Sequence, residues 1–301
     1  MTLDDYRRFY AEEIEQVASL TSSALVEAFA RVPREKFLGP PPWQLASAEL
    51  RAMAAAGLIQ ASYRTTSEPR HLYHNVVVSL DRAKDINNGQ PSGLATWIAA
   101  LDLRSGDRAY HMGCGVGYYT AIMAEMVGPG GSVVALDAQP DLAARARENL
   151  SGYPQAAVHA GDGATFDPEP CDAMPINAGV THPHALWLDR LREGGRLLMP
   201  LTLAISPTIG QGAMVKIVRQ ATGFSASTAT FLAILNGGSL RDPELEAPLR
   251  QTLAKALSTG AMFKLKSLRR DPHEPDETCL WHTPGACLST NPALCEPEEH
   301  K

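Results

Sequence analysis

A glycine-rich stretch in the middle of the chain constrains the possible folds more than any other feature. Residues 110–120 read YHMGCGVGYYT, with glycines at positions 113, 115 and 117. An apolar run, alternating glycines and then a helical pattern predict a strand, a tight loop and a helix. Glycine permits positive φ and lacks the Cβ atom that would keep a ligand away from the backbone. The first turn of the following helix adds unpaired N–H groups, so the stretch predicts a nucleotide-type ligand.

Strand-like and helix-like segments alternate around this loop. The expected strands cover residues 108–112, 132–137, 157–160, 171–176 and 196–201. The expected helices cover residues 118–127, 140–150 and 187–191, the last of them stopped by glycines 194 and 195. Two more strand-like runs, at 213–219 and 229–235, and a helix at 244–257 follow. Such alternation with short connections predicts an α/β fold with a doubly wound, mostly parallel seven-stranded sheet.

The segment before the loop is expected to be mainly helical. Apolar residues recur at helical spacing over residues 3–30, and a serine or threonine near Ser22 can cap the second of two helices there. Three prolines at 40–42 break the pattern, and the alanine-rich run 45–59 predicts another helix. We therefore expect a helical N-terminal lead-in or lid over residues 1–75, a ligand-binding domain over 76–260, and a C-terminal extension and tail over 261–301.

Charge and hydropathy argue against several classes of protein. The 27 basic and 33 acidic residues give a formal net charge of −6, without the basic stripe typical of nucleic-acid-binding proteins. No apolar run reaches the length of a membrane span, and the charged N-terminus lacks the apolar core of a signal peptide. We therefore expect a cytoplasmic protein with neither a nucleic-acid nor a membrane partner. The oligomeric state stays open.

The ligand class follows from the glycine spacing and from the ends of the next strands. Dinucleotide-binding loops have the pattern G-x-G-x-x-G, whereas here the third glycine comes at 117 and a tyrosine at 118, which favours S-adenosylmethionine over NAD. Asp137 ends the next expected strand, where a carboxylate can accept hydrogen bonds from ribose hydroxyls, and Asp162 follows the third strand, where an adenine amino group can be met. The full set expected to bind the cofactor is Gly113, Cys114, Gly115, Gly117, Asp137, Ala138, Asp162, Gly163 and Asn177.

Several segments together resemble one enzyme family. Residues 24–37 read ALVEAFARVPREKF, which is similar to the N-terminal segment of protein-L-isoaspartate O-methyltransferases and contains their V-P-R-x-x-F run. Residues 111–125, 130–150, 161–163 and 191–200 resemble that family's later blocks. The resemblance implies a Rossmann-like class I methyltransferase fold, S-adenosylmethionine as methyl donor, and a carboxylate of a peptide or protein as acceptor.

Two positions depart from the family pattern. The family's substrate loop usually reads T-I-S-x-P, and the matching residues 87–91 read NNGQP, so Gly89 stands in place of the serine. His111 replaces the acidic residue two positions before the first loop glycine. We expect substrate contacts from Asn88, Gly89, Gln90, Pro91 and Ser92, with Asn88 and Gln90 as candidates for catalytic roles.

The acceptor decides whether a general base is needed. A carboxylate is ionised at neutral pH, so the enzyme need only hold it in line with the methyl group. A hydroxyl or amine acceptor would need a base, and His182 and His184 are the candidates. Gly89 motivates the alternative of another small molecule or a modified peptide as acceptor. His111 motivates a second alternative, a cofactor-binding protein without turnover, and a nicotinamide dehydrogenase is the weakest reading because Tyr118 breaks the spacing.

The C-terminal extension contains three of the five cysteines. Cys279, His282, Cys287 and Cys295 lack a second tightly spaced ligand pair, so the linear spacing predicts thiols that are buried or in the tail, and no metal site. We expect an irregular packed segment after Arg270 and a frayed acidic tail.

Overall fold

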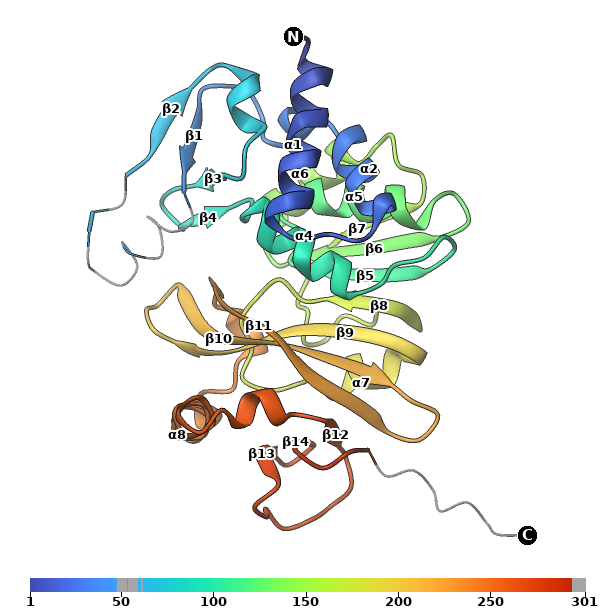
Figure 1. The fold of residues 1–301 in the computed structure, drawn as a ribbon, viewed down its shortest axis with the longest axis vertical. Coiled ribbons are helices and arrows are strands. Elements are labelled where there is room, and N and C mark those ends of the chain that lie inside the picture. The colour runs from blue at the N-terminus through green and yellow to red at the C-terminus, as the bar shows by residue number, and fades with distance from the viewer. Residues whose placement is uncertain (48–52, 54–58, 61, 294–301) are drawn as a thin grey trace. The chain divides into compact units, whose positions relative to one another are not determined.

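The computed structural model describes residues 1–47, 53, 59–60 and 62–293. The chain divides into two compact units, Met1–Gly163 and Ala164–Lys301, shown from blue to red in Figure 1. Within the described residues, none of the helices combines the length and the apolar character that crossing a membrane requires. Cys295 and the acidic residues after it lie outside the described residues.

The first unit begins with two helices, as the apolar spacing predicts. Helices α1 (Leu3–Val17) and α2 (Ser23–Arg31) pack against each other, and Ser22 caps α2 by accepting a 3.3 Å hydrogen bond from the N–H of Leu25. The apolar face of α2 also packs against the later helix α5 (Tyr118–Val127) (Figure 1). The predicted division near Ser22 and the serine cap are confirmed.

A small antiparallel sheet follows, in the order β2-β1-β3-β4. Its strands are β1 (Trp43–Ala46), β2 (Arg64–Thr66), β3 (Val77–Asp81) and β4 (Ile86–Asn87). The helix predicted over residues 45–59 is therefore wrong at its start, and most of its remainder lies outside the described residues. Leu45 pairs with Val78, and the Trp43 side chain packs on Leu72 and Val78, so tertiary packing overrides the helical tendency of the alanine-rich run.

The central part of the first unit is a parallel βαβ arrangement. Strands β5 (Arg108–Met112), β6 (Ser132–Asp137) and β7 (Ala156–Ala160) lie side by side in the order β5-β6-β7, all parallel. Helix α5 connects the first pair and α6 (Pro140–Asn149) the second, while α4 (Pro91–Ala100) precedes them. The carboxyl ends of the three strands therefore share one edge of the sheet, where the predicted cofactor residues of the first unit lie. The predicted α/β fold is confirmed.

The second unit combines a parallel strand pair with long antiparallel strands. Strand β8 (Cys171–Pro175) runs parallel to β9 (Leu191–Ala204), which pairs antiparallel with β10 (Ile209–Arg219) and through it with β11 (Phe224–Leu235). Helix α7 (Ala185–Arg190) ends before the predicted glycine stop. Strand β9 instead continues through Gly194 and Gly195. Gly194 adopts a φ of +74°, which allows a local irregularity in the strand.

The C-terminal extension is more regular than predicted. Helix α8 (Pro243–Ser258) is followed by strands β12 (Ser267–Arg269), β13 (Cys279–Thr283) and β14 (Ala286–Ser289), with β14 pairing antiparallel with both β12 and β13. The expectation of an irregular segment was wrong because the β13–β14 hairpin extends the sheet through β12 and β11. Such strands are short and lack a strong alternating pattern of their own.

Candidate functional site

The glycine loop between β5 and α5 is held by backbone hydrogen bonds. The N–H groups of Gly113 and Cys114 donate to the carbonyl of Leu136, at 2.8 and 3.0 Å. Gly117 caps the start of α5 with a φ of +90°, and a Cβ atom there would lie 2.9 Å from Leu150 Cδ1. Gly115 has a φ of +57°, and a Cβ there would meet no atom within 4 Å. The loop thus needs glycine for its conformation, and open space lies over its middle.

Asp137 joins this loop to the end of β6. Its carboxylate, only 7 % exposed, accepts hydrogen bonds from the N–H of Gly115 at 2.7 Å and of Gln139 at 2.9 Å. Burial raises the pKa of Asp137, and the two N–H donors act against that rise. Each carboxylate oxygen can accept more than one hydrogen bond. The sequence prediction that Gly115 and Asp137 belong to one site is therefore consistent with their direct contact.

These residues fit a sulfonium nucleoside. The open space over Gly115 suits a close approach by the ligand, and Asp137 has acceptor capacity left for ribose hydroxyls. Ala138 is exposed beside Asp137, while Asp162 and Gly163 follow β7 directly, at the same edge of the sheet. Burial and the neighbouring Asp137 raise the pKa of the Cys114 thiol, which keeps that side chain neutral.

His111 is a structural side chain rather than a substitute for the acidic residue of the family pattern. It is 1 % exposed, and its Nδ1 lies 2.8 Å from Thr120 Oγ1, which ties β5 to α5. Burial lowers the pKa of His111 to about 3, so its ring is neutral at neutral pH. His111 thus contributes a hydrogen bond and no charge to the interior.

A His111→Asn variant should change how stability depends on pH. Between pH 6.5 and 3 the unfolded chain binds a proton at His111 that the folded chain does not, so wild-type unfolding free energy falls as the pH falls. From pH 7 to 5 this loss is about 2 kcal/mol, and the variant lacks it. Urea unfolding at both pH values measures the difference between the two proteins. If wild type and variant differed in unfolding free energy by the same amount at both pH values, the lowered pKa of His111 would be contradicted.

The loop at residues 88–92 is fixed mainly by one buried amide. Asn88 is 8 % exposed, and its Oδ1 accepts hydrogen bonds from the N–H of Val78 at 2.9 Å and from Arg34 Nη2 at 3.3 Å. Pro91 starts α4, and the N–H of Ser92 donates to Asn75 Oδ1 at 3.0 Å. The Asn88 oxygen, predicted for substrate or catalysis, therefore serves the scaffold. The Gln90 side chain makes no capping bond to α4.

Arg34 is the residue that sequence reasoning missed. Its guanidinium is completely buried and donates to the carbonyls of Leu72, His74 and Val76, at 2.6, 3.1 and 2.7 Å. It also lies over the rings of Tyr10 and Tyr118, 5.8 and 5.9 Å from their centroids. The signal was present, because Arg34 is the arginine of the V-P-R-x-x-F run. That run served only as a family marker, without a structural role assigned to its arginine.

The structure explains why glycine occupies position 89. Gly89 has a φ of +75°, and a Cβ atom would lie 2.7 Å from Leu94 Cδ2. A Gly89→Ser variant should lose about 1–2 kcal/mol of unfolding free energy from the left-handed backbone alone. The matched control is Gly93→Ser in α4, where φ is not positive and no atom lies within 4 Å of the Cβ position. Urea unfolding of both variants checks this, and equal stabilities would contradict it.

The second unit holds the remaining predicted residues. Asn177 follows β8, and the rings of His182 and His184 lie 4.6 Å apart, between their centroids. The Nε2 of His184 lies 3.2 Å from the carbonyl of Leu240, so this nitrogen carries the proton that is donated. Burial and the neighbouring His184 lower the pKa of His182, whose Nδ1 lies 3.0 Å from Thr181 Oγ1. The structure brings the two predicted histidines together.

Comparisons with known proteins agree on one family. Residues 10–224 match the model of the family described as protein-L-isoaspartate(D-aspartate) O-methyltransferase. A protein-L-isoaspartate O-methyltransferase of Ignicoccus hospitalis is 30% identical over 204 residues, which is 66% of this chain and 82% of the relative. A solved protein-L-isoaspartate O-methyltransferase superposes with a TM-score of 0.62 at 22% identity, covering 78% of this chain and 67% of that one.

A second solved structure shares the fold at greater sequence distance. A Plasmodium falciparum protein, solved in complex with S-adenosyl-L-homocysteine, has a TM-score of 0.56 at 16% identity. The superposition covers 77% of this chain and 97% of that one. At these identities the two solved structures show that this chain shares their fold.

Proposed function

This chain belongs to the protein-L-isoaspartate(D-aspartate) O-methyltransferase family, and we propose on that premise that it transfers the methyl group of S-adenosylmethionine to a carboxylate of a peptide or protein. One observation carries the proposal, namely the direct hydrogen bond between the Asp137 carboxylate and the glycine loop at Gly115. This hydrogen bond links Asp137, which suits a ribose, to the loop backbone, which suits close approach of the methionine portion of the donor. Formation of a methyl ester on an isoaspartyl peptide is the test.

Each part of this site has its own task in holding the donor. Asp137 would accept hydrogen bonds from the ribose hydroxyls, and the Gly113–Gly117 backbone would hold the methionine portion. Asp162, which follows the third parallel strand β7, would accept a hydrogen bond from the adenine amino group. S-adenosylmethionine, when bound, supplies a methyl group on a positively charged sulfur. Cys114 and His111 are neutral, whereas Asp137 brings a carboxylate into direct contact with the loop through the N–H of Gly115.

The acceptor side needs orientation rather than proton transfer. A carboxylate acceptor is ionised at neutral pH, with a reference pKa near 4, so no residue has to remove a proton. Holding the acceptor in line with the donor can account for much of the rate enhancement. The loop at residues 88–92 is suited to this task because Asn88 and Asn75 fix its backbone from within the fold. We assign acceptor binding to Gln90 and to the backbone around it.

A second candidate function is methyl transfer to a hydroxyl or amine of another small molecule or modified peptide. The observation that favours it is the His182–His184 pair, because the lowered pKa of His182 leaves its ring neutral and able to accept a proton. Such a reaction would need a base, whereas the carboxylate reaction does not.

Replacing His182 distinguishes the two functions. With an isoaspartyl peptide as acceptor, we expect His182→Ala to keep kcat within about threefold of wild type, because no proton is removed. Loss of a general base would lower kcat by about 100-fold or more. Initial rates with labelled donor measure the change, and His159→Ala, at an exposed histidine of β7, is the control. The same loss with the isoaspartyl peptide would contradict a carboxylate reaction without a base, and a 100-fold loss at His182 alone with a hydroxyl or amine acceptor would support the second candidate.

A further inference from the structure

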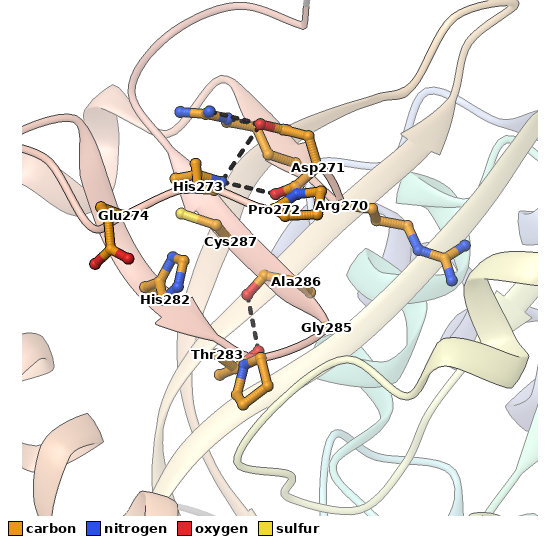
Figure 2. Close-up of a pocket in the computed structure, with 12 residues that line it drawn as sticks. Arg270, Asp271, Pro272, His273, Glu274, His282, Thr283, Gly285, Ala286 and Cys287 are labelled. Atoms are coloured by element: carbon orange, nitrogen blue, oxygen red, sulfur yellow. Dashed lines mark hydrogen bonds and ion pairs between the residues drawn. The ribbon is translucent and has the colours of Figure 1, made fainter.

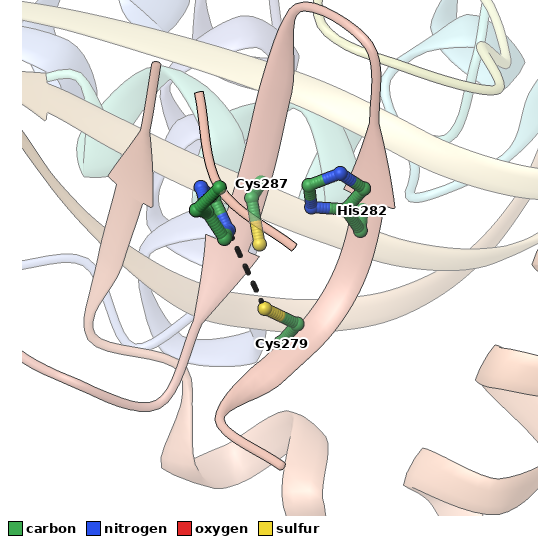
Figure 3. Close-up of side chains that lie close together, drawn as sticks. Cys279, His282 and Cys287 are labelled. Atoms are coloured by element: carbon green, nitrogen blue, oxygen red, sulfur yellow. Dashed lines mark hydrogen bonds between the residues drawn. The ribbon is translucent and has the colours of Figure 1, made fainter. Parts of the chain in front are cut away.

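Four potential metal ligands come together in the C-terminal extension, beyond the residues that match the family. They are His273, Cys279, His282 and Cys287. One ligand atom from each lies within 4.8 Å of the ligand atoms of the other three. Figure 3 shows the labelled side chains of Cys279, His282 and Cys287 converging on a common space between the strands. The linear spacing argued against a metal site, but the fold supplies the proximity that the spacing lacks.

The β13–β14 hairpin explains why these side chains converge. In a regular strand, residues three apart face opposite sides of the sheet, so Cys279 and His282 would point away from each other. The register of β13 shifts between Cys279 and Trp281, and such a bulge turns the following side chains to the other face. His282 then pairs directly with Cys287 across the ladder. The bulge thus places both members of the Cys-x-x-His segment beside Cys287.

The spacing of the ligand atoms fits a tetrahedral zinc ion. Zinc–sulfur bonds of about 2.3 Å and zinc–nitrogen bonds of about 2.0–2.1 Å place neighbouring ligand atoms roughly 3.3–3.8 Å apart. The His273 Nε2 lies 3.5 Å from Cys279 Sγ, which matches an edge of that tetrahedron. The other ligand atoms are close enough to reach it by small side-chain rotations.

Surrounding groups orient the ligands as they do in metal sites. The Nδ1 of His273 lies 2.8 Å from the carbonyl of Asp271, which fixes the tautomer with Nε2 unprotonated and facing Cys279. The N–H of Asp276 donates to Cys279 Sγ at 3.3 Å. The Nδ1 of His282 is buried and makes no hydrogen bond to the described residues, so an acceptor atom is left inside the cluster.

We propose that His273, Cys279, His282 and Cys287 bind one Zn²⁺ ion as a closed structural site. Two thiolates balance the charge of the ion, so the assembled site is neutral within a partly buried setting. Two imidazoles and two thiolates are a ligand set that suits zinc, and four protein ligands leave no open position for a substrate. A pocket of about 470 Å³, lined by His273, His282 and Cys287 among others, gives the ion a path to the ligands (Figure 2).

The site has a structural consequence for the histidine pair. Trp281 lies between two of the ligands in sequence, is 3 % exposed, and donates from its indole Nε1 to the carbonyl of Thr181 at 2.9 Å. Thr181 directly precedes His182, and its Oγ1 accepts the N–H of Asp242 at 2.9 Å. Zinc therefore holds the hairpin that, through Trp281, holds the segment carrying His182 and His184.

Metal analysis of the full chain, purified under reducing conditions with zinc present, tests the proposal. We expect about one zinc per chain in the wild type, and less than a tenth of that in a Cys279→Ser/Cys287→Ser variant. Cys171→Ala, which removes a buried cysteine on β8 of the same unit, is the control and should keep its zinc. Replacing zinc with Co²⁺ in the wild type should give the visible absorption bands of a tetrahedral site with thiolate ligands.

Two further readouts do not depend on how the variants fold. Zinc should protect Cys279 and Cys287 of the wild type from alkylation, and a chelator should make both reactive. Amide hydrogen exchange over residues 179–184 should become at least tenfold faster once the chelator has removed the metal. No stoichiometric zinc in the wild type, equal zinc in the double variant, or a Cys279–Cys287 disulfide in reduced protein would overturn the site. Metal content is independent of methyl transfer, so these results stand apart from the proposed function.

Discussion

An Arg34→Met variant is expected to lose about 3–5 kcal/mol of unfolding free energy, because it leaves several buried acceptors without a donor. The change removes a buried cation that donates to the carbonyls of Leu72, His74 and Val76 and to Asn88 Oδ1. A methionine fills much of the same volume but leaves those acceptors buried and without their donor, which costs about 1–3 kcal/mol for each one that water cannot reach. The loss should also release the loop at Asn88, because Arg34 holds that side chain.

Urea unfolding followed by circular dichroism measures this loss. Arg31→Met is the matched control, since Arg31 lies on the same N-terminal segment with its side chain 60% exposed, and its ion pairs with Glu27 and Glu125 are at the surface. We expect the control to change stability by less than about 1 kcal/mol. A loss below that value in Arg34→Met would show that the buried guanidinium is not what holds the loop.

An Asp137→Asn variant is expected to bind the cofactor at least about 100-fold more weakly. Hydrogen bonds from two hydroxyls to a charged acceptor contribute about 1.5–3 kcal/mol each, and each 1.4 kcal/mol is a factor of ten in affinity. The amide also directs an NH₂ group at one of the two backbone N–H donors, Gly115 or Gln139, which now share the carboxylate. The weaker hydrogen bonds to the ribose and the loss of one backbone hydrogen bond both lower the affinity for the cofactor.

Titration calorimetry with S-adenosylhomocysteine tests this prediction without turnover. The control is Asp141→Asn, which removes an exposed charge on the first turn of α6 that interacts with Asp137 only through space. Urea unfolding of both variants separates weaker binding from loss of the fold. A change of less than threefold in the affinity of a folded Asp137→Asn protein would contradict the role of Asp137.

The sequence predicted the features that depend on local patterns. The glycines at 113, 115 and 117 require a tight loop whatever surrounds them, and Asp137 is placed at the strand end by the periodicity of β6. The division between α1 and α2 could be predicted because a serine cap acts within three residues. Together these local rules gave the α/β fold and one edge of the candidate site.

The features that were missed depend on contacts between distant segments. Strand β1 forms because Leu45 pairs with Val78, and no local pattern shows that pairing. Asn88 reads as a loop residue, but its oxygen is used by Arg34, which lies 54 positions earlier in the chain. The cluster of cysteines and histidines needs a β-bulge and a hairpin whose strands are only five and four residues long. Linear spacing cannot show either effect.

Methyl-ester formation is the measurement that tests the central claim most directly. The full chain is incubated with S-adenosylmethionine carrying a labelled methyl group and with two peptides that differ only in an isoaspartyl or a normal aspartyl residue. The account predicts a base-labile methyl ester on the isoaspartyl peptide and none above background on its aspartyl partner. Absence of ester on the isoaspartyl peptide, from protein that binds S-adenosylhomocysteine in calorimetry, would contradict it.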